Sequence, residues 1–140
     1  MIYDSVPANE LVKKGDELIS RLLTVSIDRN KKKNIRKKAA KMYLGVIKSS
    51  SRLENLNYEF QLIGYERLGK TYFQRNDYIN AIALYNFALA ICQDENKNTT
   101  FIQSTDNYRL QLIQQIKAAE RQFLISAVNQ ELSPSDYRLD

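Results

Sequence analysis

The sequence contains no histidine and no tryptophan, and it has a single cysteine, Cys92. Histidine is the commonest general base near neutral pH and a frequent ligand of zinc and copper, so its absence removes much of the usual catalytic and metal-binding chemistry. One cysteine cannot form an internal disulfide or supply the several thiolates of a structural zinc site. We therefore expect no catalytic residue, no metal and no cofactor, and we predict that the protein is not an enzyme.

Turn-forming residues are also scarce, with four glycines and two prolines in 140 residues. This leaves little room for the tight turns of a many-stranded sandwich or barrel. The spacing of apolar residues instead predicts an all-α protein with five helices in a single domain. The expected helices run from just after Pro7, with Asn9 as a candidate N-cap, to about Leu23, and then over about 31–49, 53–75, 78–93 and 104–131, before a loose tail at 132–140.

Long uncharged runs are missing as well. The first residues lack the basic-then-apolar arrangement of a secretory signal, and the longest nearly uncharged stretch, 78–93, is too short to span a bilayer. Together with the lone cysteine, this predicts a soluble protein in a reducing, cytoplasmic compartment. Export without a cleaved signal stays open as an alternative.

Positive charge is concentrated in one segment. Of the 21 Lys and Arg residues, eight lie in 29–41 without any acidic neighbour, which leaves 13 basic residues against 16 acidic ones elsewhere. This run could bind nucleic acid, an anionic membrane surface or an acidic protein patch. The alternative is a solvated helix start that frays, because cations there oppose the helix dipole. The candidate contacts are Lys31, Lys32, Lys33, Arg36, Lys37 and Lys38.

The most informative pattern lies in the third and fourth expected helices. Small residues, Gly69 and Ala81, would let two antiparallel helices approach closely, and Asn76-Asp77 would form the turn between them. The full pattern is Tyr65, Leu68, Gly69 and Tyr72, then Ala81, Tyr85 and Ala88. It resembles the tetratricopeptide repeat, W-x2-L-G-x2-Y followed by A-x3-F and a late Pro, over about 34 residues. Gln93 replaces the final Pro.

The resemblance implies a right-handed array of antiparallel helical hairpins. Residues 53–95 would be the clear repeat, and 104–131 a capping helix. Residues 8–50 would be a degenerate first pair, because Gly15 and Tyr43 occupy places like those of Gly69 and Tyr85, although an enlarged basic connection separates them. The three-helix microtubule-interacting-and-transport domain is a similar alternative, but five helices fit the repeat better.

Proteins with this repeat are generally scaffolds or adaptors that hold a peptide or helix in a groove lined by the first helix of each repeat. The resemblance therefore implies a non-catalytic protein- or peptide-binding module. Its groove residues would be Ile63, Glu66, Lys70, Phe73 and Gln74. A solvated helix face is the other interpretation of these five. The alternatives in function are binding of nucleic acid or an anionic membrane surface through residues 29–41, and self-association into a homo-oligomer through an uncapped repeat edge.

Overall fold

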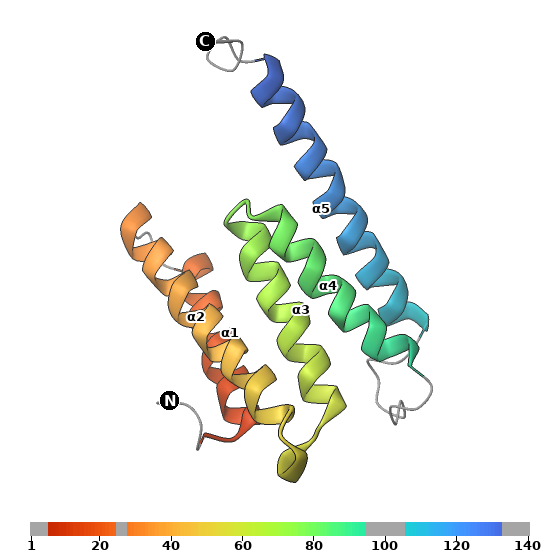
Figure 1. Ribbon diagram of the computed structural model, residues 1–140. Coiled ribbons are helices and arrows are strands. Elements are labelled where there is room, and N and C mark those ends of the chain that lie inside the picture. The colour runs from red at the N-terminus through yellow and green to blue at the C-terminus, as the bar shows by residue number, and fades with distance from the viewer. Residues whose placement is uncertain (1–5, 25–27, 95–105, 133–140) are drawn as a thin grey trace, which may run out of the picture.

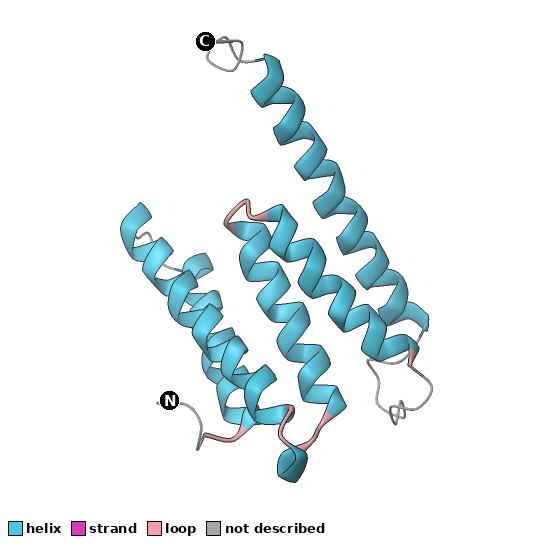
Figure 2. Cartoon of the chain, in the orientation of Figure 1, coloured by secondary structure: helices cyan, strands magenta, loops and turns pink. Residues whose placement is uncertain are grey.

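The computed structural model describes residues 6–24, 28–94 and 106–132. Within these ranges the chain is helical and contains no strand (Figure 1, Figure 2), which confirms the predicted all-α class. The elements are α1 (Ala8–Thr24), α2 (Arg29–Ser50), the short 3-10 helix η1 (Leu53–Asn55), α3 (Tyr58–Gln74), α4 (Tyr78–Gln93) and α5 (Asp106–Leu132).

The first two helices begin slightly earlier than the sequence suggests. The carbonyl of Pro7 accepts hydrogen bonds from the backbone N–H groups of Glu10 and Leu11, so α1 starts at Ala8 and the prediction of Asn9 as its N-cap is wrong. At the start of α2, the Asp28 carboxylate accepts from the backbone N–H of Lys31 at 2.9 Å. An acidic cap stabilises the positive end of the helix dipole, and it partly offsets the cations that follow.

The third predicted helix, 53–75, is interrupted. Residues Leu56 and Asn57 have extended backbones between η1 and α3, and the Asn57 side chain accepts from the N–H of Phe60 at 3.0 Å. Asn57 therefore caps a new helix rather than continuing the old one. The Asn57 backbone N–H also donates to the Ser50 carbonyl at 2.9 Å, which fixes α3 to the end of α2.

The turn between α3 and α4 confirms the prediction made for Asn76-Asp77. Asn76 has a φ of 63°, in the left-handed region that asparagine tolerates better than most residues. Asp77 accepts from the N–H of Asn80 at 3.3 Å and so caps α4. Most of the connection between the predicted helices 78–93 and 104–131, and nearly all of the predicted tail at 132–140, lie outside the described residues.

Consecutive helices pack against each other in the order α1, α2, α3, α4, α5, and α1 also contacts α3 (Figure 1). The pairs α1/α2 and α3/α4 are antiparallel hairpins. One buried cluster joins the first three helices and includes Ala39, Tyr43 and Leu68. A second cluster, which includes Leu62 and Leu112, joins α3, α4 and α5.

A glycine faces a tyrosine ring where the helices of each hairpin cross. A Cβ atom added to Gly15 would lie 2.6 Å from Cε1 of Tyr43, and one added to Gly69 would lie 2.7 Å from Cε1 of Tyr85. Both tyrosines are buried, so their rings have little freedom to move aside. The absence of a side chain at these two positions therefore lets the helices of each hairpin approach closely.

Candidate protein-binding cleft

The five predicted groove residues all lie on α3, but they do not share one open surface. Lys70 and Gln74 are exposed, and Ile63 and Phe73 are partly buried. Glu66 is only 4% exposed, because α5 packs over it and closes this part of the expected groove. The prediction that Glu66 faces a ligand therefore needs correction, and its carboxylate serves the contact between α3 and α5.

Hydrogen bonds to the Glu66 carboxylate come from two helices. Within α3, Arg67 Nη1 lies 2.9 Å from Oε1 and Lys70 Nζ lies 3.7 Å from Oε2. From α5, the Tyr108 hydroxyl donates to Oε1 at 3.0 Å and Gln115 Nε2 donates to Oε2 at 3.4 Å. A buried carboxylate needs such partners to offset its lost hydration. The two donors from α5, Tyr108 and Gln115, therefore hold α5 in a defined position on α3.

Arg67 extends this cluster to the first hairpin. Its Nε lies 3.2 Å from Oδ1 of Asp16, and the Tyr43 hydroxyl donates to the same oxygen at 2.6 Å. Burial and the hydrogen bond to Asp16 raise the pKa of Tyr43, and burial and the charge of Glu66 raise the pKa of Tyr108. Burial opposes the charge on Arg67, but the carboxylates of Asp16 and Glu66 outweigh it and raise its pKa. One polar network thus connects α1, α2, α3 and α5.

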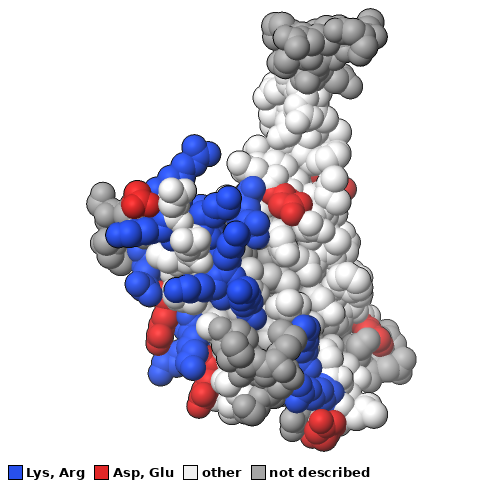
Figure 3. Space-filling model, turned by 60° about the vertical axis from the view of Figure 1, so that its left-hand side comes forward, with Lys and Arg blue, Asp and Glu red and all other residues white. Residues whose placement is uncertain are grey.

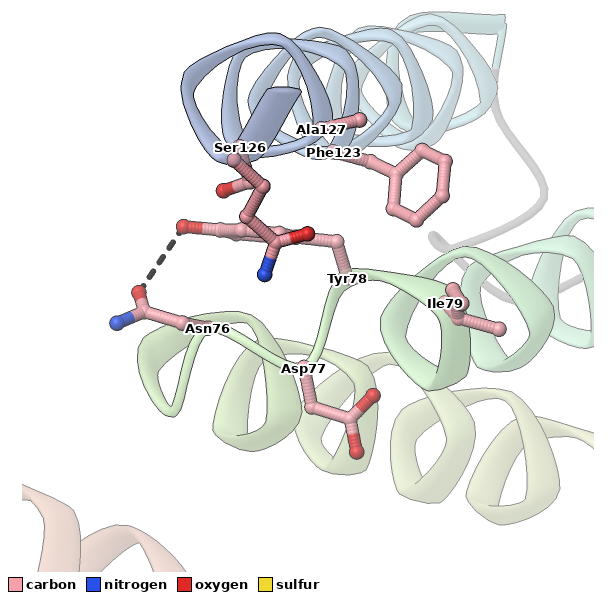
Figure 4. A pocket seen from close by; sticks show the side chains of 8 residues that line it. Asn76, Asp77, Tyr78, Ile79, Phe123, Ser126 and Ala127 are labelled. Atoms are coloured by element: carbon pink, nitrogen blue, oxygen red, sulfur yellow. Dashed lines mark hydrogen bonds between the residues drawn. The ribbon is translucent and has the colours of Figure 1, made fainter. Parts of the chain in front are cut away.

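A cleft of about 320 Å³ lies between the α3–α4 turn and the far half of α5 (Figure 4). The Tyr78 hydroxyl donates to Oδ1 of Asn76 at 2.9 Å within it, and the Phe73 ring packs edge-on against the Tyr78 ring with centroids 5.4 Å apart. Phe73, one of the predicted groove residues, therefore supports the wall of the cleft. The lining residues are Asn76, Asp77, Tyr78, Ile79, Phe123, Ser126, Ala127 and Gln130.

Exposed apolar side chains occur on both walls of this cleft and on other faces of the far half of α5. Ile79 is 64% exposed at the start of α4. On α5, Phe123, Leu124, Ile125 and Val128 are all at least 39% exposed, and residues 122–130 contain no charged side chain. Figure 1 shows that this half of α5 extends past the α3–α4 turn. Single exposed apolar residues are common on proteins, but Ile79 and Phe123 face each other across a cleft, and a cleft with apolar walls is typical of an interaction site.

The sequence predicted a capping helix at 104–131 but not its exposed far half. In the first half of α5, Tyr108, Leu112, Ile116 and Ala119 pack against the core. Phe123 lies opposite the first residues of α4, Tyr78 and Ile79, across the cleft, and it is 39% exposed. The lengths of the two helices indicate the exposure of the far half, because α4, with 16 residues, cannot cover the whole length of α5, with 27 residues.

The predicted basic contacts lie along the first half of α2, and basic side chains gather on this face of the molecule (Figure 3). Lys32 and Arg36 are partly buried. The other four candidates, Lys31, Lys33, Lys37 and Lys38, are exposed. Within the described residues, none of the six forms an ion pair with a carboxylate. The structure thus brings these cations onto one helix, on a surface separate from the residues that line the cleft.

In the part of the chain that the structure describes, no group of three or more Cys, Asp or Glu side chains could hold a metal ion. None of the described helices combines the length and the apolar character needed to cross a membrane. Cys92 is 2% exposed, and burial raises the pKa of its thiol to about 11. At neutral pH the thiol is therefore protonated and a poor nucleophile.

Comparisons with protein-family models, with curated proteins and with solved structures gave no match.

Proposed function

We propose that the protein is a non-catalytic scaffold or adaptor module that binds an apolar peptide or helix of another protein in the cleft beside α5. The observation that carries this proposal is the uncovered far half of α5. Phe123 lines a cleft that already has the size of a few side chains, and Leu124 and Val128 are exposed on the neighbouring face of α5. Burial of each Leu, Ile or Phe side chain by a partner contributes on the order of 2 kcal/mol.

We further propose that the hairpins are successive repeats of the tetratricopeptide kind. The equivalent contacts of Gly15 with Tyr43 and of Gly69 with Tyr85 support this. The alanines one turn before these tyrosines, Ala39 and Ala81, are both fully buried. In such an array, α5 would be the first helix of a third unit, and a second helix would normally cover its outer face.

This interpretation explains why a helix is a suitable ligand. Leu124 and Val128 are four positions apart, so they lie on one face of α5 and form the kind of row that receives the apolar face of another helix. Lys70 and Gln74, the exposed members of the predicted groove, lie toward the same end of α3 as Phe73. They would supply polar contacts at the edge, whereas Glu66 would remain within the protein.

The proposal can be tested with peptides selected from a random library of helical sequences for binding to the whole chain. Phe123→Asp should weaken the selected peptides by about 30-fold or more, because it places a charge where an apolar contact is expected. Leu110→Asp is a matched control, since Leu110 is 52% exposed on the same helix about 20 Å away. It should change affinity by less than about twofold.

Circular dichroism would establish that both variants keep their helices. The proposal is wrong if the selected peptides bind the Phe123→Asp variant as tightly as the unchanged protein, or if both variants lose binding equally.

A further inference from the structure

The first hairpin continues well beyond the crossing point that it shares with the second. Gly15 precedes Ala39 by 24 positions, whereas Gly69 precedes Ala81 by 12. After Gly69, α3 ends within five residues at Gln74, but α1 runs on from Gly15 to Thr24. The additional helical length forms an extended end, which we call the tip and define as residues 18–23 and 28–38.

Positive charge on the tip is not balanced. Arg21 comes from α1, and seven further Lys and Arg residues occupy 29–38 of α2. Asp28 is the only carboxylate of the tip, and it caps α2. Arg29, Lys33 and Lys37 follow each other at intervals of four, so they form one row along the helix and repel each other.

Three cations elsewhere in the fold differ from those of the tip. Arg67, Lys70 and Arg109 each lie within ion-pair distance of a carboxylate. Among the described residues, no carboxylate pairs with a cation of the tip. An external anion that bound this row of unpaired like charges would reduce the repulsion between them.

An apolar side chain accompanies these charges. Leu23 is 85% exposed at the end of α1, among the most exposed large apolar residues described. Neither aromatic nor glycine residues occur in the tip, so it offers no platform on which bases could stack and no phosphate-binding loop. An exposed leucine beside several cations instead fits a surface with apolar chains beneath negative charges, which is the structure of an anionic bilayer.

We propose that the tip docks on the surface of membranes that contain anionic phospholipid. Arg29, Lys33 and Lys37 contact the headgroups, and Leu23 enters the boundary of the acyl chains. Contact of this kind is peripheral and reversible, because one leucine provides little apolar area and the charges are screened by salt. The cleft beside α5 is formed by other residues, so the protein could bind a membrane and a partner protein together.

The first experiment measures co-sedimentation of the whole chain with vesicles of phosphatidylcholine, alone or with about 30 mol% phosphatidylserine. We expect binding only to the anionic vesicles, and a loss of about tenfold or more between about 0.05 M and 0.3 M salt. Reversal of two charges of the row, Lys33→Glu with Lys37→Glu, should weaken binding by a further tenfold or more, at roughly fivefold or more for each charge reversed. Leu23→Ser should weaken it several-fold without any change in net charge.

A matched control is available on α5, where Lys117 and Arg121 are also exposed and four positions apart. Lys117→Glu with Arg121→Glu changes the net charge by the same amount but leaves the tip intact, so vesicle binding should fall by less than about threefold. An equal loss in both double variants would mean that net charge alone is responsible, and would overturn the proposal. Circular dichroism of each variant separates this outcome from unfolding.

Two further experiments identify the ligand and the surface of the protein that binds it. Fluorescence anisotropy with a short DNA duplex, at the same salt, would assign the tip to nucleic acid if the duplex bound more tightly than the vesicles and Leu23→Ser had no effect on either. The variant Phe123→Asp would assign the membrane contact to the end of α5 if it, rather than Leu23→Ser, abolished vesicle binding. Either result overturns the docking of the tip on lipid.

Discussion

In the first hairpin Gly15 faces Tyr43, and in the second Gly69 faces Tyr85, with nearly the same spacing to the ring. Beyond this shared crossing the two hairpins differ. The second turns at once through Asn76 and Asp77, whereas the first continues as the basic tip. Close packing therefore constrains the crossing, whereas the end of a hairpin can change in length and charge without altering that contact.

The hairpins also differ in their neighbours. The second lies between α2 on one side and α5 on the other, whereas α1 packs on α2 and, more slightly, on α3. The polar network follows this asymmetry, because Arg67 and Glu66, both on α3, reach α1 and α5 respectively. Loss of a contact in the second hairpin should therefore affect more of the molecule than loss of the equivalent contact in the first.

The largest effect is expected from the two carboxylates of the network. Glu66→Ala should lower the free energy of unfolding by about 3 kcal/mol, because Glu66 is buried and its removal leaves Tyr108 and Gln115 without their acceptor. Asp16→Ala should cost only about 1 kcal/mol, since the Asp16 side chain is 42% exposed and water can replace it. Urea denaturation followed by circular dichroism measures both. Equal losses would contradict the asymmetry between the hairpins.

A smaller effect is expected from methyl groups added at the crossings. Gly69→Ala should destabilise the protein by about 2 kcal/mol, since the clash with the Tyr85 ring exceeds the gain in helix propensity of about 1 kcal/mol. Gly15→Ala should cost about 1 kcal/mol, because the terminal hairpin can adjust more easily. The double variant Gly69→Ala with Tyr85→Leu tests the cause. If its loss equalled or exceeded the sum of the two single losses, the ring would not be the obstacle.

The smallest effect is expected in the rate at which the Cys92 thiol is alkylated. The folded Cys92 thiol, whose pKa burial raises to about 11, should react with iodoacetamide at pH 8 far more slowly than the unfolded chain. Gly69→Ala should accelerate labelling more than Gly15→Ala, because Cys92 lies in the second hairpin. Equal acceleration would show that the hairpins open together.

Because burial raises the pKa of the same thiol, we expect the stability of the fold to depend on pH. The unfolded thiol releases its proton near pH 9, whereas the folded thiol keeps it to about pH 11. Between pH 9 and about pH 11 the folded state therefore binds more protons than the unfolded state. The stabilisation that the protonated thiol provides is fully present below pH 9 and decreases as the pH rises from 9 to about 11. In Cys92→Ala this part of the alkaline loss should disappear when unfolding is compared at pH 8 and pH 10.

Local patterns in the sequence predicted much of the fold. The ends of α4 at Tyr78 and Gln93, and the turn at Asn76-Asp77, follow from capping residues and apolar spacing that act within a few positions. The break before α3 was missed, because Asn57 competes as a cap with the apolar pattern that runs across it.

The candidate site was less predictable, because it depends on contacts between distant segments. The resemblance to the repeat implied that Glu66 lies in an open groove. Glu66 is instead buried, and Tyr108 and Gln115, which lie 42 and 49 positions away, donate hydrogen bonds to its carboxylate. The cleft likewise requires knowledge of where α5 passes the α3–α4 turn. The basic residues of α2 and the enlarged connection that contains them were both visible in the sequence, because their charge and spacing are local features.

The way α5 is held has a mechanical consequence. Its hydrogen bonds to Glu66 lie in its first half, and Ala127 in the cleft lies 12 residues, or about 18 Å, beyond Gln115. Apolar packing against α3 and α4 extends further along the helix, to Ala119, so the free part of α5 begins there. Ala127 lies eight residues, or about 12 Å, beyond Ala119, and a bend of about 5° at that point would shift it by about 1 Å. A small change in the packing of the first half of α5 would thus change the width of the cleft.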